Sequence, residues 1–107
     1  MEKLCFQPER FRGVIVALNA CYDKAGEVSP AACRALCRWY QSLGVRGVYV
    51  GGSTGECGAM NTAERKEVLE CALAVCGDAL PVIAGCNSTN VRESIELAQH
   101  AEAHGAV

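Results

Sequence analysis

Residues 47–56 read GVYVGGSTGE and combine an apolar run with a polar turn rich in glycine. Residues 47–50 form a short run with β-branched side chains, which is typical of a strand buried on both faces. Two glycines and two adjacent hydroxyls follow, in a loop that extends to Met60. In a parallel sheet this loop lies at the carboxyl end of its strand, where α/β proteins bind their ligands.

The same alternation of strand and helix repeats on both sides of this segment. Apolar runs at 13–18 and 81–85 predict two more strands, so that strands begin near residues 14, 48 and 82, about 34 residues apart. Apolar residues at helical spacing predict a helix after each strand, at 30–43, 62–76 and 91–104. Strands that alternate with helices form right-handed crossovers, so the sequence predicts an α/β fold with a parallel sheet.

Local signals mark where the helices begin. Ser29 followed by a proline is typical of an N-cap and a first helical turn. Asn61 with Glu64, and Asn90 with Glu93, match the spacing of a capping box, in which the glutamate bonds back to the cap. In the third helix, the apolar residues at helical spacing are expected to face the core. These residues are Val91, Ile95, Ala98 and Ala101.

No linker or change of composition divides the chain, so residues 1–107 are predicted to form a single domain. Three parallel strands would leave two open edges, and three helices on one face would leave the other face uncovered. The repeat also predicts a fourth strand where the sequence reaches Val107. We therefore expect an incomplete domain, because a closed barrel of eight such units takes about 250 residues.

The composition excludes several classes of protein. The chain has 107 residues, of which 50% are hydrophobic and 21% charged, with a net charge of −2, as in a folded globular domain. No apolar segment approaches the roughly 20 residues of a membrane helix, and the first residues lack the apolar stretch of a secretory signal. The near-neutral charge argues against a nucleic-acid surface. We therefore predict a cytoplasmic protein that binds neither membranes nor nucleic acids.

The eight cysteines are scattered along the chain without a C-x-x-C pair. Several of them fall on predicted apolar faces, where a free cysteine behaves as a small buried side chain. We therefore expect reduced thiols rather than a disulfide framework. A cysteine-rich metal or redox module is a remaining alternative, which a measurement of zinc content would reveal.

Gly52, Ser53 and Thr54 form the candidate binding site of the sequence. Two adjacent hydroxyls and nearby backbone N–H groups make a compact set of donors that suits a carboxylate or a phosphate. The loop lacks the spacing of a phosphate-binding P-loop. Two alternatives are open: a tight turn with a polar tip, and a small α/β module that binds a small carboxylate or phosphate without covalent catalysis.

Residues 47–56 resemble the signature of the N-acetylneuraminate lyase and dihydrodipicolinate synthase family. The runs at 13–18 and 80–85, together with Ala63-Glu64-Arg65 and Ser88-Thr89-Asn90, agree in order and spacing, so the resemblance covers about residues 12–107. It implies an α/β fold that is the N-terminal part, about three βα units, of a (β/α)8 TIM barrel. It also implies a homotetramer and a class I aldolase or lyase that needs no cofactor. Such an enzyme binds pyruvate as a Schiff base on lysine and forms or cleaves the carbon–carbon bond to an aldehyde or sugar acceptor.

The resemblance assigns roles to residues of the central loop. Ser53 and Thr54 would hold the pyruvate carboxylate with the backbone around Gly52, and Ser53 would also hydrogen-bond the tyrosine that carries protons. A serine at this position favours an N-acetylneuraminate lyase over a synthase. The segment Asn19-Ala20-Cys21-Tyr22 departs from the usual Thr-Pro-Phe of the family, which leaves the exact substrate open.

Other reactive side chains have simpler explanations. Glu56 is expected to tie the loop together through backbone N–H groups, Cys57 to be buried and inert, and Tyr49 to be a core or subunit contact. His100 and His104 are one helical turn apart, a spacing that can bind zinc. The sequence shows no third ligand, and histidines are favourable at a helix C-terminus, so we predict no metal site.

The Schiff-base lysine and the catalytic tyrosine of the family belong to later strands and are absent from this chain. Lys3, Lys24 and Lys66 are in the terminal segment, a polar loop and a predicted helix, and none is in a strand where burial could lower its pKa. We therefore expect the 107-residue chain alone to have no lyase activity. Incubation with pyruvate and borohydride should leave its mass unchanged, and a reduced adduct on any of the three lysines would contradict this.

Overall fold

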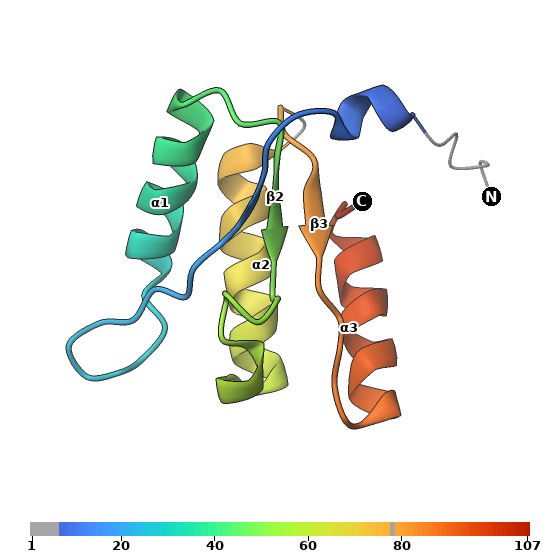
Figure 1. Ribbon diagram of the computed structural model, residues 1–107. Coiled ribbons are helices and arrows are strands. Elements are labelled where there is room, and N and C mark those ends of the chain that lie inside the picture. The colour runs from blue at the N-terminus through green and yellow to red at the C-terminus, as the bar shows by residue number, and fades with distance from the viewer. Residues whose placement is uncertain (1–6, 78) are drawn as a thin grey trace.

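The computed structural model describes residues 7–77 and 79–107, which leaves Lys3 and Cys5 outside the described part. Three parallel strands form one sheet in the order β1-β2-β3 and alternate with three helices (Figure 1). The strands are β1 (Ile15–Ala17), β2 (Gly47–Val50) and β3 (Val82–Ala84), and the α-helices are α1 (Pro30–Ser42), α2 (Thr62–Cys76) and α3 (Val91–Ala103). Two short 3₁₀ helices, η1 (Pro8–Phe11) and η2 (Cys57–Ala59), precede β1 and α2.

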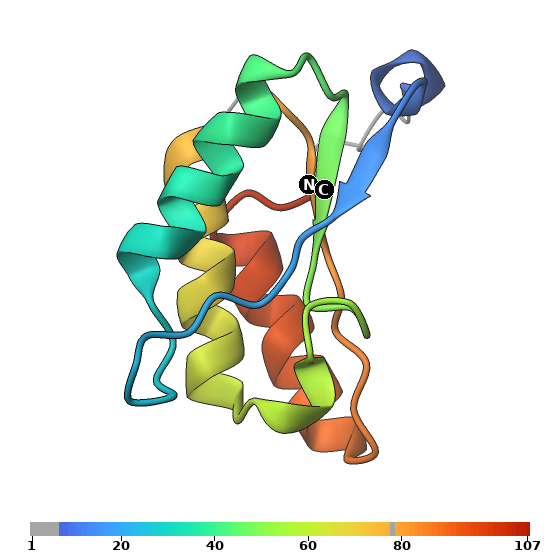
Figure 2. The ribbon, with the colours of Figure 1, turned by 60° about the vertical axis from the view of Figure 1, so that its left-hand side comes forward.

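The parallel sheet and its position relative to the helices confirm the fold predicted from the repeat. Val48 of β2 pairs with Val16 of β1 and with Val82 of β3. All three helices lie on one side of the sheet, and no described helix covers the other side (Figure 2). None of the described helices is long and apolar enough to cross a membrane.

The core lies between the sheet and the helices. Val48 is fully buried and Val50 is 3% exposed, whereas Tyr49 between them is half-buried, because successive side chains of a strand point to opposite faces. The buried core consists of Leu18, Cys33, Cys37, Val48, Val50, Val68, Leu69, Cys71, Ala72, Cys76, Val82 and Ala101.

Cysteines fill much of the contact between α1 and α2. The seven described cysteines are free thiols, as predicted. Cys37 is fully buried, and hydrogen bonding with Cys33 and Cys76, together with burial, raises the pKa of its thiol. Burial is also the main cause that raises the pKa of Cys71. The thiols of Cys37 and Cys71 therefore stay protonated at neutral pH and act as small apolar side chains.

Two of the predicted helix starts are confirmed. The Ser29 hydroxyl accepts a hydrogen bond from the N–H of Ala32 (3.2 Å) at the start of α1. At the start of α2, the Asn61 side chain accepts from the N–H of Glu64 (2.8 Å), and the Glu64 carboxylate accepts from the N–H of Asn61 (3.0 Å). This reciprocal pair is a complete capping box.

The start of α3 differs from the prediction. Asn90 is the N-cap and accepts from the N–H groups of Arg92 (3.0 Å) and Glu93 (3.4 Å), but the predicted return bond from Glu93 to Asn90 is wrong. Ser88 intervenes: its hydroxyl donates to the Glu93 carboxylate (2.8 Å) and accepts from the N–H of Asn90 (3.1 Å). The Asn90 N–H therefore donates to Ser88 of the preceding loop, and not to the Glu93 carboxylate as it would in a capping box.

The prediction of the buried face of α3 is also wrong in part. Val91 is 72% exposed, Ile95 is 51% exposed and Ala98 is exposed, whereas Leu97 and Ala101 are buried. The helix packs against α2 on one side, and its other flank is at the end of the helical layer (Figure 1). The exposed apolar residues of α3 therefore form a second apolar face, which no described segment covers. After α3 the chain returns to the sheet, where the N–H of Val107 donates to the carbonyl of Val82 (2.9 Å).

A buried arginine holds together the two loops that follow β2 and β3. Arg65, near the start of α2, is 9% exposed. Its Nη1 donates to the carbonyl of Asn87 (2.6 Å), and its Nη2 donates to the carbonyls of Gly85 (2.9 Å) and Gly51 (3.5 Å). Hydrogen bonds from a charged donor are worth about 1.5–3 kcal/mol each, so this guanidinium fixes the relative position of the loops.

Replacement of Arg65 should therefore destabilise the fold. We expect Arg65→Met, which keeps most of the aliphatic stem, to lower the free energy of unfolding by about 3 kcal/mol, because three part-buried hydrogen bonds from a charged donor are lost. The matched control is Arg38→Met on the exposed surface of α1, which should change stability by no more than about 0.5 kcal/mol. Equal unfolding curves for the two variants in urea would contradict the role of Arg65.

Candidate functional site

The turn that follows β2 is closed by its own backbone. The N–H of Glu56 donates to the carbonyl of Ser53 (3.0 Å), and the N–H of Cys57 donates to the carbonyl of Gly52 (3.3 Å). The turn begins immediately after the last residue of β2, at the carboxyl edge of the sheet, and bends toward the side opposite the helices (Figure 2). Its position is therefore set by the central strand.

Glycines in this turn permit two close approaches. Gly51 has a φ of +84°, which other residues rarely adopt. A Cβ at Gly52 would overlap the ring of Tyr49, so the ring packs directly on the backbone of the turn. These constraints explain why a glycine pair, rather than any small polar pair, precedes the two hydroxyls.

The three predicted binding residues, Gly52, Ser53 and Thr54, lie together in this turn. Gly52 is buried, while Ser53 and Thr54 are exposed. Within residues 7–77 and 79–107, the hydroxyls and the backbone N–H groups of Ser53 and Thr54 have no hydrogen-bond partner. Two hydroxyls and two N–H groups at one turn can therefore donate to an anion without giving up an internal bond.

Tyr49 is a neighbour of the turn that the sequence prediction did not connect with it. Its ring lies under Gly52, and a Cβ at Gly85 would be 2.8 Å from its hydroxyl oxygen. The same Cβ would be 2.6 Å from the carbonyl oxygen of Gly51, so the loops after β2 and β3 touch through glycine backbones. The strand alternation, with apolar valines on both sides of Tyr49, was the signal that this side chain faces away from the helices.

The structure corrects the role predicted for Glu56. The residue is exposed and its carboxylate makes no capping hydrogen bond to η2. Its backbone is left-handed (φ 55°, ψ 39°), which is a strained conformation for a residue other than glycine. The loop is closed by backbone hydrogen bonds instead. The charge of Glu56 has a small effect on Tyr22. Desolvation is the main cause that raises the pKa of Tyr22 above its ordinary value, and the charges of Glu56 and Glu64 add to it.

A cavity of about 560 Å³ lies beside the turn but does not include the hydroxyls. It opens between η2, the start of α2 and the loop before α3, and Asn87 Nδ2 donates to the sulfur of Cys57 (3.6 Å) within its lining. The lining residues are Cys57, Gly58, Met60, Asn61, Thr62, Arg65, Asn87, Ser88, Thr89 and Glu93. Ser53 and Thr54 are exposed and are not among these lining residues, so they form an open surface outside this cavity.

No lysine among the described residues is placed to attack a ligand held by the turn. Lys24 is exposed in the loop between β1 and α1. Lys66 is on α2, where its Nζ pairs with the carboxylate of Glu96 (2.6 Å) on α3. As predicted, neither is in a strand.

Comparison with known proteins connects this geometry to one family. The sequence profile of the Dihydrodipicolinate synthetase family matches residues 10–107. The N-acetylneuraminate lyase of Mediterraneibacter gnavus is 45% identical over 97 residues, which are 91% of this chain and 31% of that protein.

Solved structures agree with the sequence comparison. A catalytic-lysine mutant of the Ruminococcus gnavus sialic acid aldolase has a TM-score of 0.91 at 44% identity, over 94% of this chain and 33% of that one. A prophage protein of the dihydrodipicolinic acid synthase family from Escherichia coli, in complex with pyruvate, has a TM-score of 0.85 at 33% identity, over 90% of this chain and 32% of that one.

The chain spans about a third of the length of these relatives. Its three βα units have the arrangement of the N-terminal part of a TIM-barrel aldolase, as the resemblance implied. The profile match covers almost the whole sequence. The chain therefore belongs to the Dihydrodipicolinate synthetase family.

Proposed function

We propose that this chain is the pyruvate-binding, N-terminal part of a class I aldolase or lyase. The observation that carries the proposal is the turn Gly52-Ser53-Thr54, whose hydroxyls and N–H groups have no partner within the described residues. It follows the central strand of a chain that belongs to a family of pyruvate enzymes. A small carboxylate is the ligand that best matches a compact cluster of donors of this kind.

In the proposed mechanism the turn binds and orients the pyruvate carboxylate. A lysine supplied from outside this chain attacks the carbonyl carbon, water leaves, and the protonated imine withdraws electrons from the adjacent methyl carbon. Fixing the carboxylate at Ser53 and Thr54 would align that carbon with the acceptor. Ser53 would also hydrogen-bond the tyrosine that transfers the proton. The whole protein would act as a homotetramer in the cytoplasm.

Two observations favour an N-acetylneuraminate lyase as the whole enzyme. Ser53 precedes Thr54 in the turn, a pair that resembles the lyase side of the family. The relative from Mediterraneibacter gnavus, which is 45% identical to this chain, is an N-acetylneuraminate lyase. The acceptor would then be a sugar aldehyde.

The Schiff base can be tested on the protein made from the native gene. We expect pyruvate and borohydride to produce a covalent adduct on a lysine, visible as a mass increase, in a protein of roughly 300 residues. An 11.3 kDa product without an adduct would contradict the aldolase proposal and favour a module that binds carboxylate without covalent chemistry.

The turn itself can be tested in the adduct-forming protein. Ser53→Ala and Thr54→Val should each lower kcat/KM for pyruvate by about 10- to 100-fold, because each removes one hydrogen bond to a charged group. Ser42→Ala, which removes a hydroxyl that bonds the Trp39 carbonyl at the far end of α1, is the matched control and should retain activity. Full activity of both turn variants would contradict carboxylate binding at this loop.

The acceptor is tested by comparing the rates at which the protein catalyses the two reactions of the family. We expect cleavage of N-acetylneuraminate to pyruvate and N-acetylmannosamine to proceed faster than condensation of pyruvate with aspartate semialdehyde. The opposite order would assign the protein to the synthase side and leave the role of the turn intact.

A further inference from the structure

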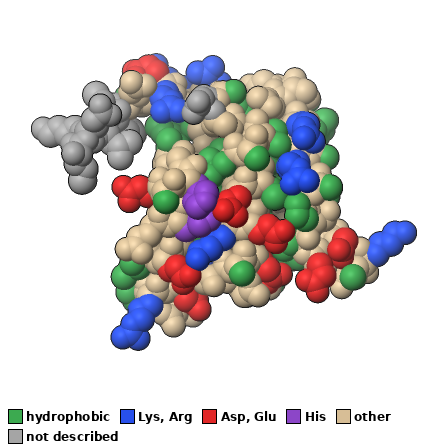
Figure 3. Space-filling model, turned by 180° about the vertical axis from the view of Figure 1, so that it is seen from behind, with side chains coloured by type: hydrophobic (Ala, Val, Ile, Leu, Met, Phe, Trp, Pro, Cys, Tyr) green, Lys and Arg blue, Asp and Glu red, His purple; other side chains and the backbone are tan. Residues whose placement is uncertain are grey.

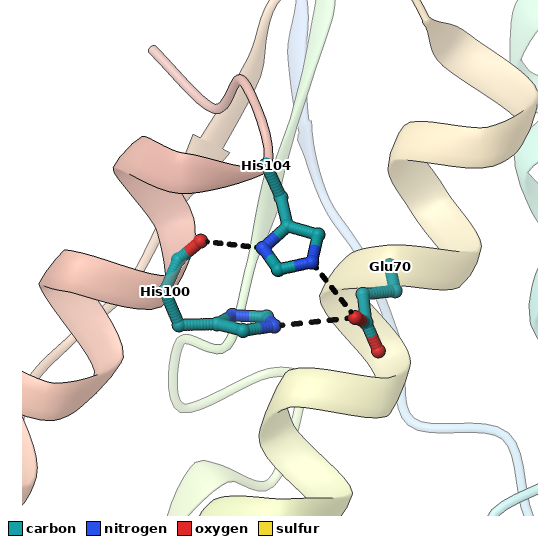
Figure 4. A group of neighbouring side chains, drawn as sticks. All are labelled: Glu70, His100 and His104. Carbon is teal, nitrogen blue, oxygen red and sulfur yellow. Dashed lines mark hydrogen bonds and ion pairs between the residues drawn. The ribbon is translucent and has the colours of Figure 1, made fainter.

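The two histidines of the chain, both at the end of α3, face one glutamate of α2 (Figure 4). His100 Nε2 is 3.4 Å and His104 Nε2 is 3.0 Å from the same carboxylate oxygen of Glu70. The three ligand atoms all lie within 4.8 Å of one another. The sequence pattern showed only the histidine pair, because Glu70 is on a different helix. The cluster is on the outer side of the helical layer, where the histidines are visible beside acidic side chains (Figure 3).

Hydrogen bonding determines which nitrogen of His104 faces the glutamate. Its Nδ1 is 2.8 Å from the carbonyl oxygen of His100, and a carbonyl can only accept, so Nδ1 carries a proton. In the neutral ring, Nε2 therefore presents a lone pair to a carboxylate oxygen 3.0 Å away. Two electron-rich atoms are stable at this distance only when a proton or a cation lies between them.

The surroundings hold the rings in position. The side chain of His100 is only 12% exposed, and its Nδ1 is buried without a hydrogen-bond partner among the described residues, so Nε2 is the nitrogen that faces Glu70. The rings of His100 and His104 stack with their centroids 4.1 Å apart. The nearby cation Lys66 is paired with Glu96 at 2.6 Å, so its charge is largely compensated.

We propose that Glu70, His100 and His104 bind a divalent transition-metal ion that bridges α2 and α3. Two imidazole nitrogens and one carboxylate oxygen are a ligand set that suits zinc, and tetrahedral zinc sites with ligands at about 2.0–2.2 Å place neighbouring ligands about 3.3–3.5 Å apart. The two histidine–glutamate separations of 3.4 and 3.0 Å need only small adjustments, and the two imidazole nitrogens lie within 4.8 Å of each other. The hydrogen bond from His104 Nδ1 to a backbone carbonyl is the support that metal-bound histidines usually have.

The test is a titration of the full 107-residue chain with Zn²⁺, followed by NMR of the imidazole ring protons. Because the chain has only two histidines, every imidazole signal reports on this site. We expect one equivalent of Zn²⁺ to shift the signals of both rings together. Glu70→Gln should weaken binding by at least about tenfold, since it removes a charged ligand. His104→Ala should abolish the response of His100 at the same Zn²⁺ concentration.

The matched control is Glu67→Gln, which removes the same charge from an exposed position one turn earlier on α2 and should leave Zn²⁺ affinity unchanged. The eight cysteines could also bind Zn²⁺, and that binding would leave the imidazole signals unmoved. Unmoved imidazole signals, or equal Zn²⁺ affinity in the Glu70→Gln and Glu67→Gln variants, would overturn the proposal and leave the cluster as a histidine–glutamate ion pair.

Discussion

The pairing of β2 on both of its sides is the constraint on which the rest of this structure depends. β1 and β3 satisfy its backbone polar groups, and Val48 and Val50 are buried under the helices. A strand that is both hydrogen-bonded and covered has little freedom to shift, because a change of register would expose its valines. The turn that contains Ser53 and Thr54 begins at its last residue and therefore has a precise position.

The buried guanidinium of Arg65 extends this rigidity from the sheet to the loops. It binds carbonyls after both β2 and β3, and the backbones of Gly51 and Gly85 touch without side chains between them. The donors of the turn are consequently held in place before any ligand arrives. Prior organisation of this kind reduces the entropy that binding a small anion would cost.

The two candidate binding sites lie on different parts of the molecule and use different chemistry. Hydroxyl and N–H donors at the carboxyl edge of the sheet suit an anion. The imidazoles and the carboxylate of Glu70, His100 and His104, between two helices, suit a cation. The turn after β2 has its place from the order of strands and helices that this chain shares with its structural relatives, while the histidine cluster depends on how two helices of this chain pack side by side.

The sequence by itself determined the strands, the order of the helices, the caps at Ser29 and Asn61, and the turn at residues 51–56. All of these follow from interactions within a few residues, which composition and spacing record directly. Only the tertiary structure decided that Arg65 reaches Asn87, that Ser88 replaces a capping bond of Glu93, and that Glu70 meets the two histidines. Tertiary packing also determined which side of α3 is buried. These contacts join separate segments of the chain, and their distances depend on how the helices and loops pack, which no local pattern specifies.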